Sequence, residues 1–266
     1  MQAYEGLPIL TAQPERTTRL VAIWPLDREG SVADYARRAH AAIDELIAQG
    51  KTPVVAGGTG LYLRAALVDL ELPPAPTRER RAHWERVYDR VGGEHAHRLL
   101  TERDPKAAGR LHPNDRRRIV RALELTELAS SLRPASDRLW SEETRHPTAI
   151  FGLDVPRDVL VERIERRAHA MFDAGVEEEA RRALAGTVSA TAVHALGLRD
   201  LVELPHDRAF DALVLRTRRY AAYQRKWMRR IPGLVMVDAD RPPGEVADDI
   251  VEMARARQLV PRRRGR

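Results

Sequence analysis

Residues 53–67, PVVAGGTGLYLRAAL, decide the fold of this chain. A short apolar run rich in β-branched residues ends at two glycines, and good helix formers follow at once, which predicts a buried parallel strand, a tight turn and a helix. Gly57, Gly58 and Gly60 would let a ligand approach the unpaired N–H groups and the positive end of that helix. The Thr59 hydroxyl would meet a phosphate oxygen or a reacting group. The alternative is a turn that only connects a strand to a helix, because short glycine motifs are weak signals.

The composition bounds the class of protein. The chain has 266 residues, of which 43% are hydrophobic, enough for one large domain or two small ones. Because it has no cysteine, disulfides, thiolate catalysis and cysteine-based metal sites are excluded, and a reducing cytoplasm fits. No apolar run approaches the roughly 20 residues that span a bilayer, and the first residues do not form a signal peptide. The histidines show no metal-ligand spacing. We therefore expect a cytoplasmic monomer with no membrane association and no metal held by its own side chains.

The charge is strongly basic, with a formal net charge of +6. Only Lys51, Lys106 and Lys226 are lysines, so arginine supplies nearly all of the cations. Arginine suits the recognition of phosphates and nucleic acids. A bias in genome composition would produce the same excess, so the positions of the arginines must decide their role.

The first third of the chain predicts an α/β layer. Residues 20–24 form a probable strand, and Ser31 is placed to cap a helix that runs to about Ala48. Gly50 ends that helix, and the strand at Pro53 follows. A strand, a helix and a second strand at this spacing form a βαβ unit with a parallel sheet.

The pattern changes at Pro73, after which only helices are predicted until a strand at 147–153 resumes the α/β layer. The predicted helices of this insertion are 77–91, 94–101, 105–111 and 114–129, the last with Asn114 as its N-cap. The predicted domains are an α/β part at 1–72, an all-helical insertion at 73–146, and a second α/β part at 147–266.

The last part of the chain is mostly helical. The predicted elements are a helix from Pro156 to about Ala174, a break at Gly175 and a continuation to Leu184, helices at 190–203 and 207–230, a strand at 234–237, a helix at 243–258, and a basic tail at 262–266.

A cluster of arginines marks a second candidate site in residues 114–124, NDRRRIVRALE. Arg117, Arg118 and Arg121 are three or four residues apart and therefore share one face of a helix. A rigid arginine cluster is a natural clamp for nucleic acid phosphates. The alternative is a solvated face that pairs internally with acidic residues such as Glu124.

A third candidate stretch, residues 217–230, lies in the helix predicted over 207–230. Its basic residues are candidates to hold a diphosphate or RNA, and the alternative is that they pair with nothing. Its cations fall on two neighbouring stripes, while its aromatic residues form an apolar face that is more typical of a core than of a platform for nucleobases. The first stripe holds Arg218, Arg225 and Arg229, the second holds Arg219, Lys226 and Arg230, and the aromatic face holds Tyr220, Tyr223 and Trp227.

Taken together, the order and spacing of the motifs resemble the tRNA dimethylallyltransferases, the isopentenyl diphosphate transferase family, over nearly the whole chain. MQAYEGL with TAQP is similar to the family's "MQVYRGL…TAKP", and TRRYAAYQRKWMR is similar to its "TRxYAxxQxxWxR". The other matching pieces are SVADY at 31–35, GGTGLY at 57–62, LHPND at 111–115 and RALE at 121–124.

The resemblance implies a concrete activity. The family transfers a dimethylallyl group from its diphosphate to the exocyclic N6 amine of adenosine 37 in tRNA, with Mg²⁺ bound to the diphosphate. It implies an α/β fold with a parallel sheet of the P-loop NTPase type, flanking helices and an all-helical insertion that grips the anticodon stem-loop. The leaving diphosphate needs cations and N–H donors, and the target base must be pulled out of its loop.

The resemblance also assigns residues to these roles. Thr59 would contact the reacting diphosphate, with Gly57, Gly58 and Gly60 around it, and Arg81 would neutralise the diphosphate. The residues assigned to tRNA binding are Gln2, Arg117, Arg118, Ile119, Val120, Arg121, Arg218 and Arg229.

The printed sequence departs from the family at its start. Family members begin with a strand and a phosphate loop, GxxxxGK(S/T), and place a general-base aspartate just before the segment that matches Met1–Gln2. The sequence contains neither. We expect that the true start lies upstream, that the chain as printed has little or no activity, and that the missing strand leaves apolar surface and backbone groups uncovered. Smaller departures, at 18–20, 197–199 and 222–223, affect tRNA contacts near the late helix.

Three other functions stay open at the level of sequence. A transferase for free adenine nucleotides is disfavoured by the helical insertion, since a free nucleotide needs no such clamp. A tRNA-binding module without chemistry fits the missing loop and base, and predicts salt-sensitive binding of tRNA without product. A nucleoside triphosphatase has little support without a phosphate loop.

Overall fold

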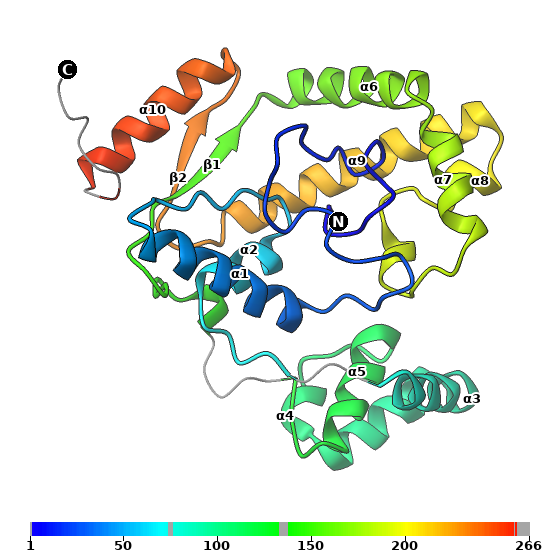
Figure 1. Ribbon diagram of the computed structural model, residues 1–266. Helices are drawn as coiled ribbons and strands as arrows, with labels where there is room; N and C mark the ends of the chain where they lie inside the picture. Colours follow the sequence, from blue (N-terminus) through cyan, green and yellow to red (C-terminus); the bar gives the residue numbers. More distant parts are fainter. Residues whose placement is uncertain (1, 74–76, 133–137, 258, 260–266) are drawn as a thin grey trace. The chain divides into compact units, whose positions relative to one another are not determined.

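The computed structural model describes residues 2–73, 77–132, 138–257 and 259 (Figure 1). The chain divides into two compact units, the first made of Met1–Val68 with Leu139–Arg266 and the second of Asp69–Arg138. The second unit corresponds to the helical insertion predicted at 73–146. The last residues of that predicted range, from Leu139 on, belong instead to the first unit. The predicted basic tail at 262–266 lies outside the described residues.

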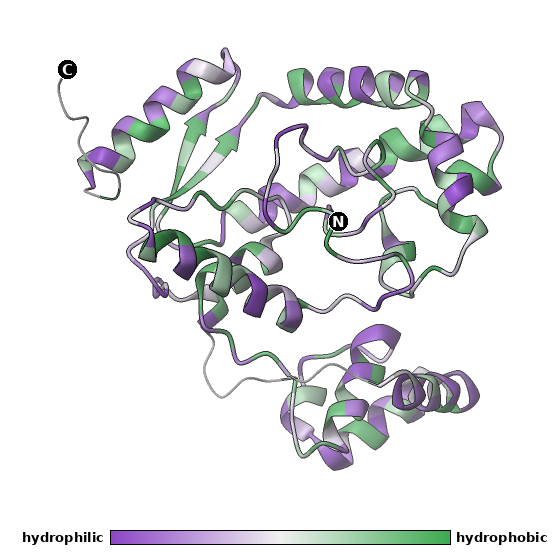
Figure 2. Ribbon diagram, viewed as in Figure 1, coloured by the Kyte–Doolittle hydropathy of each residue, from purple (hydrophilic) through white to green (hydrophobic). Residues whose placement is uncertain are grey.

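The sheet of the first unit pairs two parallel strands, β1 (Ile150–Asp154) and β2 (Leu234–Asp238). Ile150 faces Leu234, and the register continues to Asp154 opposite Asp238. Both predicted strands are therefore confirmed, although β1 begins three residues later than the predicted range. The strands are largely apolar in Figure 2, in keeping with their position inside an α/β layer.

The strand predicted at Pro53–Ala56 is wrong. This stretch is irregular, its backbone makes no hydrogen bond to any described residue, and the Val54 side chain is 89% exposed. A strand exists only when a neighbouring strand supplies hydrogen bonds and cover. Within the described ranges no such neighbour lies beside these residues.

The strand predicted at 20–24 is reduced to a single parallel bridge between Tyr4 and Trp24. Leu20 and Ala22 adopt positive φ angles of 65° and 49°, which an extended strand does not allow. The chain still follows the N-terminal segment at this point, since Ile23 N donates to Ala3 O at 2.8 Å.

Helices α1 (Val32–Ala48) and α2 (Gly60–Leu67) pack against each other in the first unit. Ser31 caps α1 as predicted, because its side chain accepts a hydrogen bond from Asp34 N at 3.1 Å. Gly50 follows α1 with a φ of 69°, a conformation that favours glycine. The helix expected after the glycine turn is confirmed as α2.

The remaining helices of the first unit follow in the second half of the chain. They are α6 (Arg157–Asp173), α7 (Val176–Ala185), the 3₁₀ turns η1 (Arg138–Trp140, which begins one residue inside the second unit) and η2 (Ala192–His194), α8 (Asp200–Glu203), α9 (His206–Met228) and α10 (Pro243–Ala256). Gly175 separates α6 from α7 with a φ of 87°, as the sequence predicts. The helix predicted at 190–203 is wrong: η2 and α8 replace it, because Gly197 interrupts the chain with a φ of 83°.

The main core of the first unit forms where α6 and α9 lie side by side, with α7 and α8 at one end (Figure 1). Leu7 and Leu10 of the N-terminal segment are buried in it together with Leu198 and Leu213. The start of the chain is therefore part of the core, although it forms no regular element.

The second unit is a small helical assembly with its own core. Helix α3 (Arg78–Arg103) bends at Gly92, whose φ of 77° and ψ of 163° are not helical, so the two helices predicted there are recovered. Helices α4 (Pro105–Ala108) and α5 (Arg116–Thr126) complete it, α4 being shorter than the predicted 105–111. The core side chains are Trp84, Ala96, Leu100, Ala108, Ile119, Val120, Ala122 and Leu123.

The N-cap of α5 is Asp115 rather than the predicted Asn114. Asp115 Oδ1 accepts a hydrogen bond from Arg118 N at 3.2 Å. Both residue types cap helices well, but a carboxylate also interacts favourably with the positive end of the helix.

None of the helices that the structure describes is long and apolar enough to cross a membrane.

Candidate functional site

The glycine-rich loop at 57–60 is held against the C-terminal half of α9. Thr59 occupies the N-cap position of α2, but its side chain makes no capping hydrogen bond. Its Oγ1 instead forms a hydrogen bond with Tyr220 Oη at 2.8 Å. Because either hydroxyl can donate, Tyr220 can donate to Thr59 and leave the Thr59 proton for another acceptor.

Two of the three glycines are required by this packing. A Cβ atom at Gly58 would overlap the side-chain amide of Gln224, and one at Gly60 would overlap the ring of Trp227. A Cβ at Gly57 would meet nothing within 4 Å. The sequence-based prediction was that all three glycines open the backbone to a ligand. The structure shows that Gly58 and Gly60 pack closely against side chains of α9, and that of the three glycines only Gly57 faces open space.

Sequence analysis did not place Gln224 in the site, and it put Tyr223 on the buried aromatic face. Tyr223 is in fact 50% exposed. The side chains that meet the loop are Tyr220, Gln224 and Trp227. Their spacing of i, i+4 and i+7 is one stripe of a helix, and that spacing is the signal that could have identified them.

An aromatic contact fixes the end of α9 next to the loop. The ring centroids of Trp227 and Trp140 are 4.8 Å apart, and the Arg230 guanidinium lies 3.8 Å from the Trp140 centroid. Buried Arg64 of α2 holds the same segment, since its Nε donates to Leu139 O at 2.9 Å. Burial lowers the pKa of the Arg64 guanidinium. These contacts explain why residues from Leu139 on belong to the first unit.

Gln2, predicted to bind tRNA, lies in a loop that closes on itself. Its Nε2 donates to Thr11 O at 3.1 Å and to Ala12 O at 2.6 Å. Buried Glu179 of α7 anchors the middle of this loop, because it accepts hydrogen bonds from Ile9 N at 2.9 Å and Leu10 N at 2.8 Å. The MQAYEGL and TAQP motifs are therefore one folded piece, with Gln2 at the surface.

Arg81 and Arg121 meet in the second unit around a single carboxylate. Arg81 Nε donates to Glu124 Oε1 at 2.7 Å, and Arg121 Nη1 donates to Glu124 Oε2 at 3.0 Å. Glu124 is completely buried. The structure thus brings together an arginine assigned to the diphosphate and one assigned to tRNA. Thr59 and Arg81, which the resemblance places at one diphosphate, belong to different units.

The rest of the predicted tRNA segment divides into surface and core. Arg117 and Arg118 are exposed, and Arg118 approaches Asp115 at 3.6 Å. Ile119 and Val120 are buried in the core of the second unit. Their side chains therefore hold α5 in place and do not reach a ligand, so the prediction of direct contact by these two residues is corrected.

The predicted arginine stripe of α9 is largely engaged in ion pairs. Arg218 pairs with Glu165 of α6, and Arg225 lies 3.1 Å from Asp154 at the end of β1. Arg229 is exposed at the C-terminal end of α9, and no ion pair joins it to a described residue. Of the two arginines assigned to tRNA in this region, Arg218 is in an ion pair, and Arg229 is exposed without one among the described residues.

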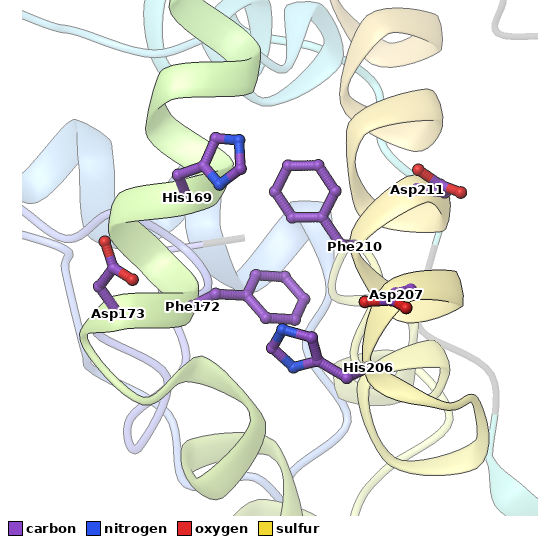
Figure 3. Close-up of a pocket in the computed structure, with 7 residues that line it drawn as sticks. All are labelled: His169, Phe172, Asp173, His206, Asp207, Phe210 and Asp211. Atoms are coloured by element: carbon purple, nitrogen blue, oxygen red, sulfur yellow. The ribbon is translucent and has the colours of Figure 1, made fainter.

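A separate hollow lies between α6 and α9 (Figure 3). Its volume is about 380 Å³, and its lining residues are His169, Phe172, Asp173, His206, Asp207, Phe210 and Asp211. The ring centroids of His169 and Phe210 are 4.5 Å apart, with the rings tilted by 37°. His206 Nδ1 lies 3.1 Å from Glu177 Oε2. None of the predicted site residues lines this hollow. In the part of the chain that the structure describes, no three His, Asp or Glu side chains gather closely enough to hold a metal ion.

Comparison with known proteins identifies the family of the chain. The family model for IPP transferase matches residues 2–231. A tRNA dimethylallyltransferase of Corynebacterium jeikeium is 35% identical, with 91% of this chain and 82% of the relative covered. A tRNA dimethylallyltransferase of Thermobifida fusca is 37% identical, with 91% and 79% covered.

Solved structures show the same likeness. The full-length tRNA isopentenylpyrophosphate transferase of Bacillus halodurans superposes with a TM-score of 0.66 at 29% identity, covering 97% of this chain and 85% of that protein. A eukaryotic dimethylallyltransferase acting on tRNA superposes with a TM-score of 0.72 at 20% identity, covering 100% and 73%, a likeness of fold alone. The predicted fold class, α/β with a parallel sheet of the P-loop NTPase type, is confirmed. The chain belongs to the IPP transferase family.

Proposed function

We propose that this protein is a tRNA dimethylallyltransferase, which moves a dimethylallyl group from its diphosphate to N6 of adenosine 37 and so forms N6-isopentenyladenosine. One observation carries the proposal. Two of the motifs that carry the family resemblance, residues 57–62 and 217–229, are far apart in sequence and meet through the hydrogen bond between Thr59 and Tyr220. The named relatives are 35% and 37% identical over most of this chain.

The proposed reaction needs three things from the protein. The N6 lone pair forms a bond to C1 of the dimethylallyl group while the C1–O bond breaks, and the diphosphate leaves with the electron pair. Hydrogen-bond donors must stabilise the negative charge that develops on the diphosphate. We assign this role to the Thr59 hydroxyl and the Arg81 guanidinium. A base must take the N6 proton. In the family that the chain resembles, an aspartate has this role.

We propose Mg²⁺ as the cofactor, carried by the diphosphate oxygens. Magnesium retains several waters and often binds through one or two carboxylates together with substrate phosphates. Because the described residues gather no metal-binding cluster, the proposal assigns no set of protein ligands to the ion. The metal would add positive charge where the leaving group becomes anionic.

We further propose that the anticodon stem-loop of tRNA is the partner, bound by a cytoplasmic monomer. Arg117 and Arg118 are exposed on α5, and Arg229 is exposed at the end of α9. Contacts of this kind are to phosphates and fix the position of the RNA without reading its sequence. Gln2, at the surface of its loop, is the proposed polar contact near the reacting base.

The test is a mass-spectrometric assay of nucleosides. The 266-residue chain, and a form extended at its N-terminus by any residues that the reading frame encodes upstream, are each incubated with unmodified tRNA, dimethylallyl diphosphate and Mg²⁺. Parallel samples contain AMP in place of tRNA, or EDTA in place of Mg²⁺. We expect isopentenyladenosine in tRNA from at least one of the two forms, no prenylated AMP, and loss of product with EDTA.

Other outcomes of this assay would contradict parts of the proposed function. Product on AMP but not on tRNA would overturn the tRNA assignment. Salt-sensitive tRNA binding without product from either form would identify a tRNA-binding module. Product from the 266-residue chain would show that the base is one of its own residues.

A further inference from the structure

A buried carboxylate in the second unit is shared by two arginines from different helices. Glu124 of α5 is 0% exposed, while the side chains of Arg81 on α3 and Arg121 on α5 are 35% and 16% exposed. Glu124 Oε1 accepts a hydrogen bond from Arg81 at 2.7 Å, and Glu124 Oε2 accepts one from Arg121 at 3.0 Å and a longer one from Arg81 at 3.5 Å. The carboxylate and the two guanidinium groups therefore carry a net charge of +1. The carboxylate is buried, and the two guanidinium groups lie nearer the surface.

The geometry leaves part of the Arg81 guanidinium turned away from the carboxylate. Arg81 uses Nε and Nη2 toward Glu124, with Nη2 at 3.5 Å from Oε2. Its Nη1 makes no hydrogen bond to a described residue. A guanidinium held by one edge is restricted in rotation, so its other edge can meet a phosphate oxygen with little further loss of side-chain entropy.

We propose that Glu124 is a positioning residue that joins Arg81 and Arg121 into one phosphate-binding unit. The inference rests on the proposed function and names what holds its arginines in place. The ligand is a phosphate oxygen, either of the dimethylallyl diphosphate or of the tRNA backbone. Glu124 itself touches neither ligand, because it is fully buried. Its role is to fix the direction of the two cations that do.

A purely structural ion pair predicts a different response to mutation. The protein is basic, so the removal of one negative charge raises the overall attraction for a polyanion and should tighten tRNA binding. A positioning role predicts the opposite sign. Without its charge the two arginines repel each other and lose their common orientation, and binding should weaken although the protein has become more positive.

Glu127, the C-cap residue of α5, supplies a matched control. It accepts a hydrogen bond from Trp84 Nε1 at 3.0 Å and lies 3.6 Å from Arg80, an arginine outside the predicted site. Its substitution by glutamine removes the same charge at the end of α5 and leaves the unit of Arg81 and Arg121 intact. The comparison of the two variants therefore separates orientation from charge.

The experiment compares Glu124→Gln with Glu127→Gln in the form of the protein that yields isopentenyladenosine in the nucleoside assay. Circular dichroism first establishes that each variant is folded at the assay temperature. The dissociation constant for unmodified tRNA is then measured at several salt concentrations, and KM and kcat are measured for dimethylallyl diphosphate. We expect Glu124→Gln to weaken tRNA binding or raise KM by about tenfold with little change in kcat, because a buried partner is lost. Glu127→Gln should stay within about twofold of the original protein.

The two arms identify the source of the phosphate. A change in the tRNA dissociation constant alone assigns the unit to the RNA backbone, and a change in KM alone assigns it to the diphosphate. Equal or tighter tRNA binding by Glu124→Gln, with KM unchanged, overturns the inference. If the unsubstituted protein neither binds tRNA nor forms product, the proposed function itself has failed.

A second pair of variants keeps the test decisive if Glu124→Gln does not fold. Arg81→Lys keeps the charge but loses the planar fork, and Arg80→Lys makes the same change beside Glu127. We expect Arg81→Lys to weaken phosphate binding and Arg80→Lys to leave it unchanged. Equal effects of the two substitutions would show that charge without orientation is sufficient and would overturn the inference.

Discussion

At Gly60 the contact with α9 leaves room for a hydrogen atom only, whereas Gly57 faces open space. We expect Gly60→Ala to reduce the free energy of unfolding by about 1–3 kcal/mol, because the Trp227 ring is held by Trp140 and cannot move aside freely. Gly57→Ala should stay within about 0.5 kcal/mol. Urea denaturation of both variants measures the difference. Equal stabilities would mean that the loop does not pack on α9 as described.

Substitution of Thr59 tests whether the glycine-rich loop has a catalytic role in addition to its structural one. Thr59→Val keeps the shape of the side chain and removes the donor, so the initial rate of prenyl transfer should fall about 100-fold, as for other lost donors to a developing anion. Tyr220→Phe removes the other half of the hydrogen bond and should have a smaller effect, since the Thr59 hydroxyl remains. A Thr59→Val protein with an unchanged rate would remove Thr59 from the proposed site.

Asp44 should make stability depend on acid pH. Hydrogen bonds from Arg145 and His146 lower the pKa of this carboxyl from 3.8 to about 2. A lowered pKa adds stability that is present above the ordinary value and lost as the pH falls toward the folded value. Between pH 5 and pH 2 the urea midpoint of the original protein should therefore fall more steeply than that of Asp44→Asn. Parallel curves would show that these hydrogen bonds do not persist in solution.

At the scale of elements, the start of α1 depends on one side chain. Ser31 accepts the Asp34 N–H, and the Asp34 carboxylate in turn pairs with Arg28 at 2.9 Å. We expect Ser31→Ala to lower the free energy of unfolding by about 1 kcal/mol. Thermal denaturation followed by circular dichroism tests this, with Ser31→Asp as the control that retains a cap. A loss in both variants would point to a role of the hydroxyl outside capping.

The elements that sequence analysis located correctly are those with local determinants. Ser31 marks the start of α1, Gly175 the break between α6 and α7, and Gly92 the bend in α3. Each of these signals acts within a few residues of the chain. Residues 53–56 carry an equally clear strand pattern and are irregular, because a strand also requires a partner that local sequence does not specify.

At the scale of the whole molecule, the two units have separate cores. Leu100 is buried in the core of the second unit. Leu100→Ala should therefore destabilise that unit by about 2–5 kcal/mol. Hydrogen exchange should show reduced protection in α3 and α5 and unchanged protection in α6 and α9. A uniform loss of protection throughout the chain would show that the units unfold as one.

The sequence by itself determined the family, the α/β class, most of the helices, and the residue types at the site. These properties depend on local spacing and on motifs that can be recognised in order along the chain. Only the tertiary structure decided that Gly58 and Gly60 face α9, that Ile119 and Val120 are core residues, and that Arg81 and Arg121 share Glu124. The physical reason is that each of these facts is set by packing. The hydrogen bond between Thr59 and Tyr220 joins residues 161 positions apart, a distance over which no helical or strand period gives information.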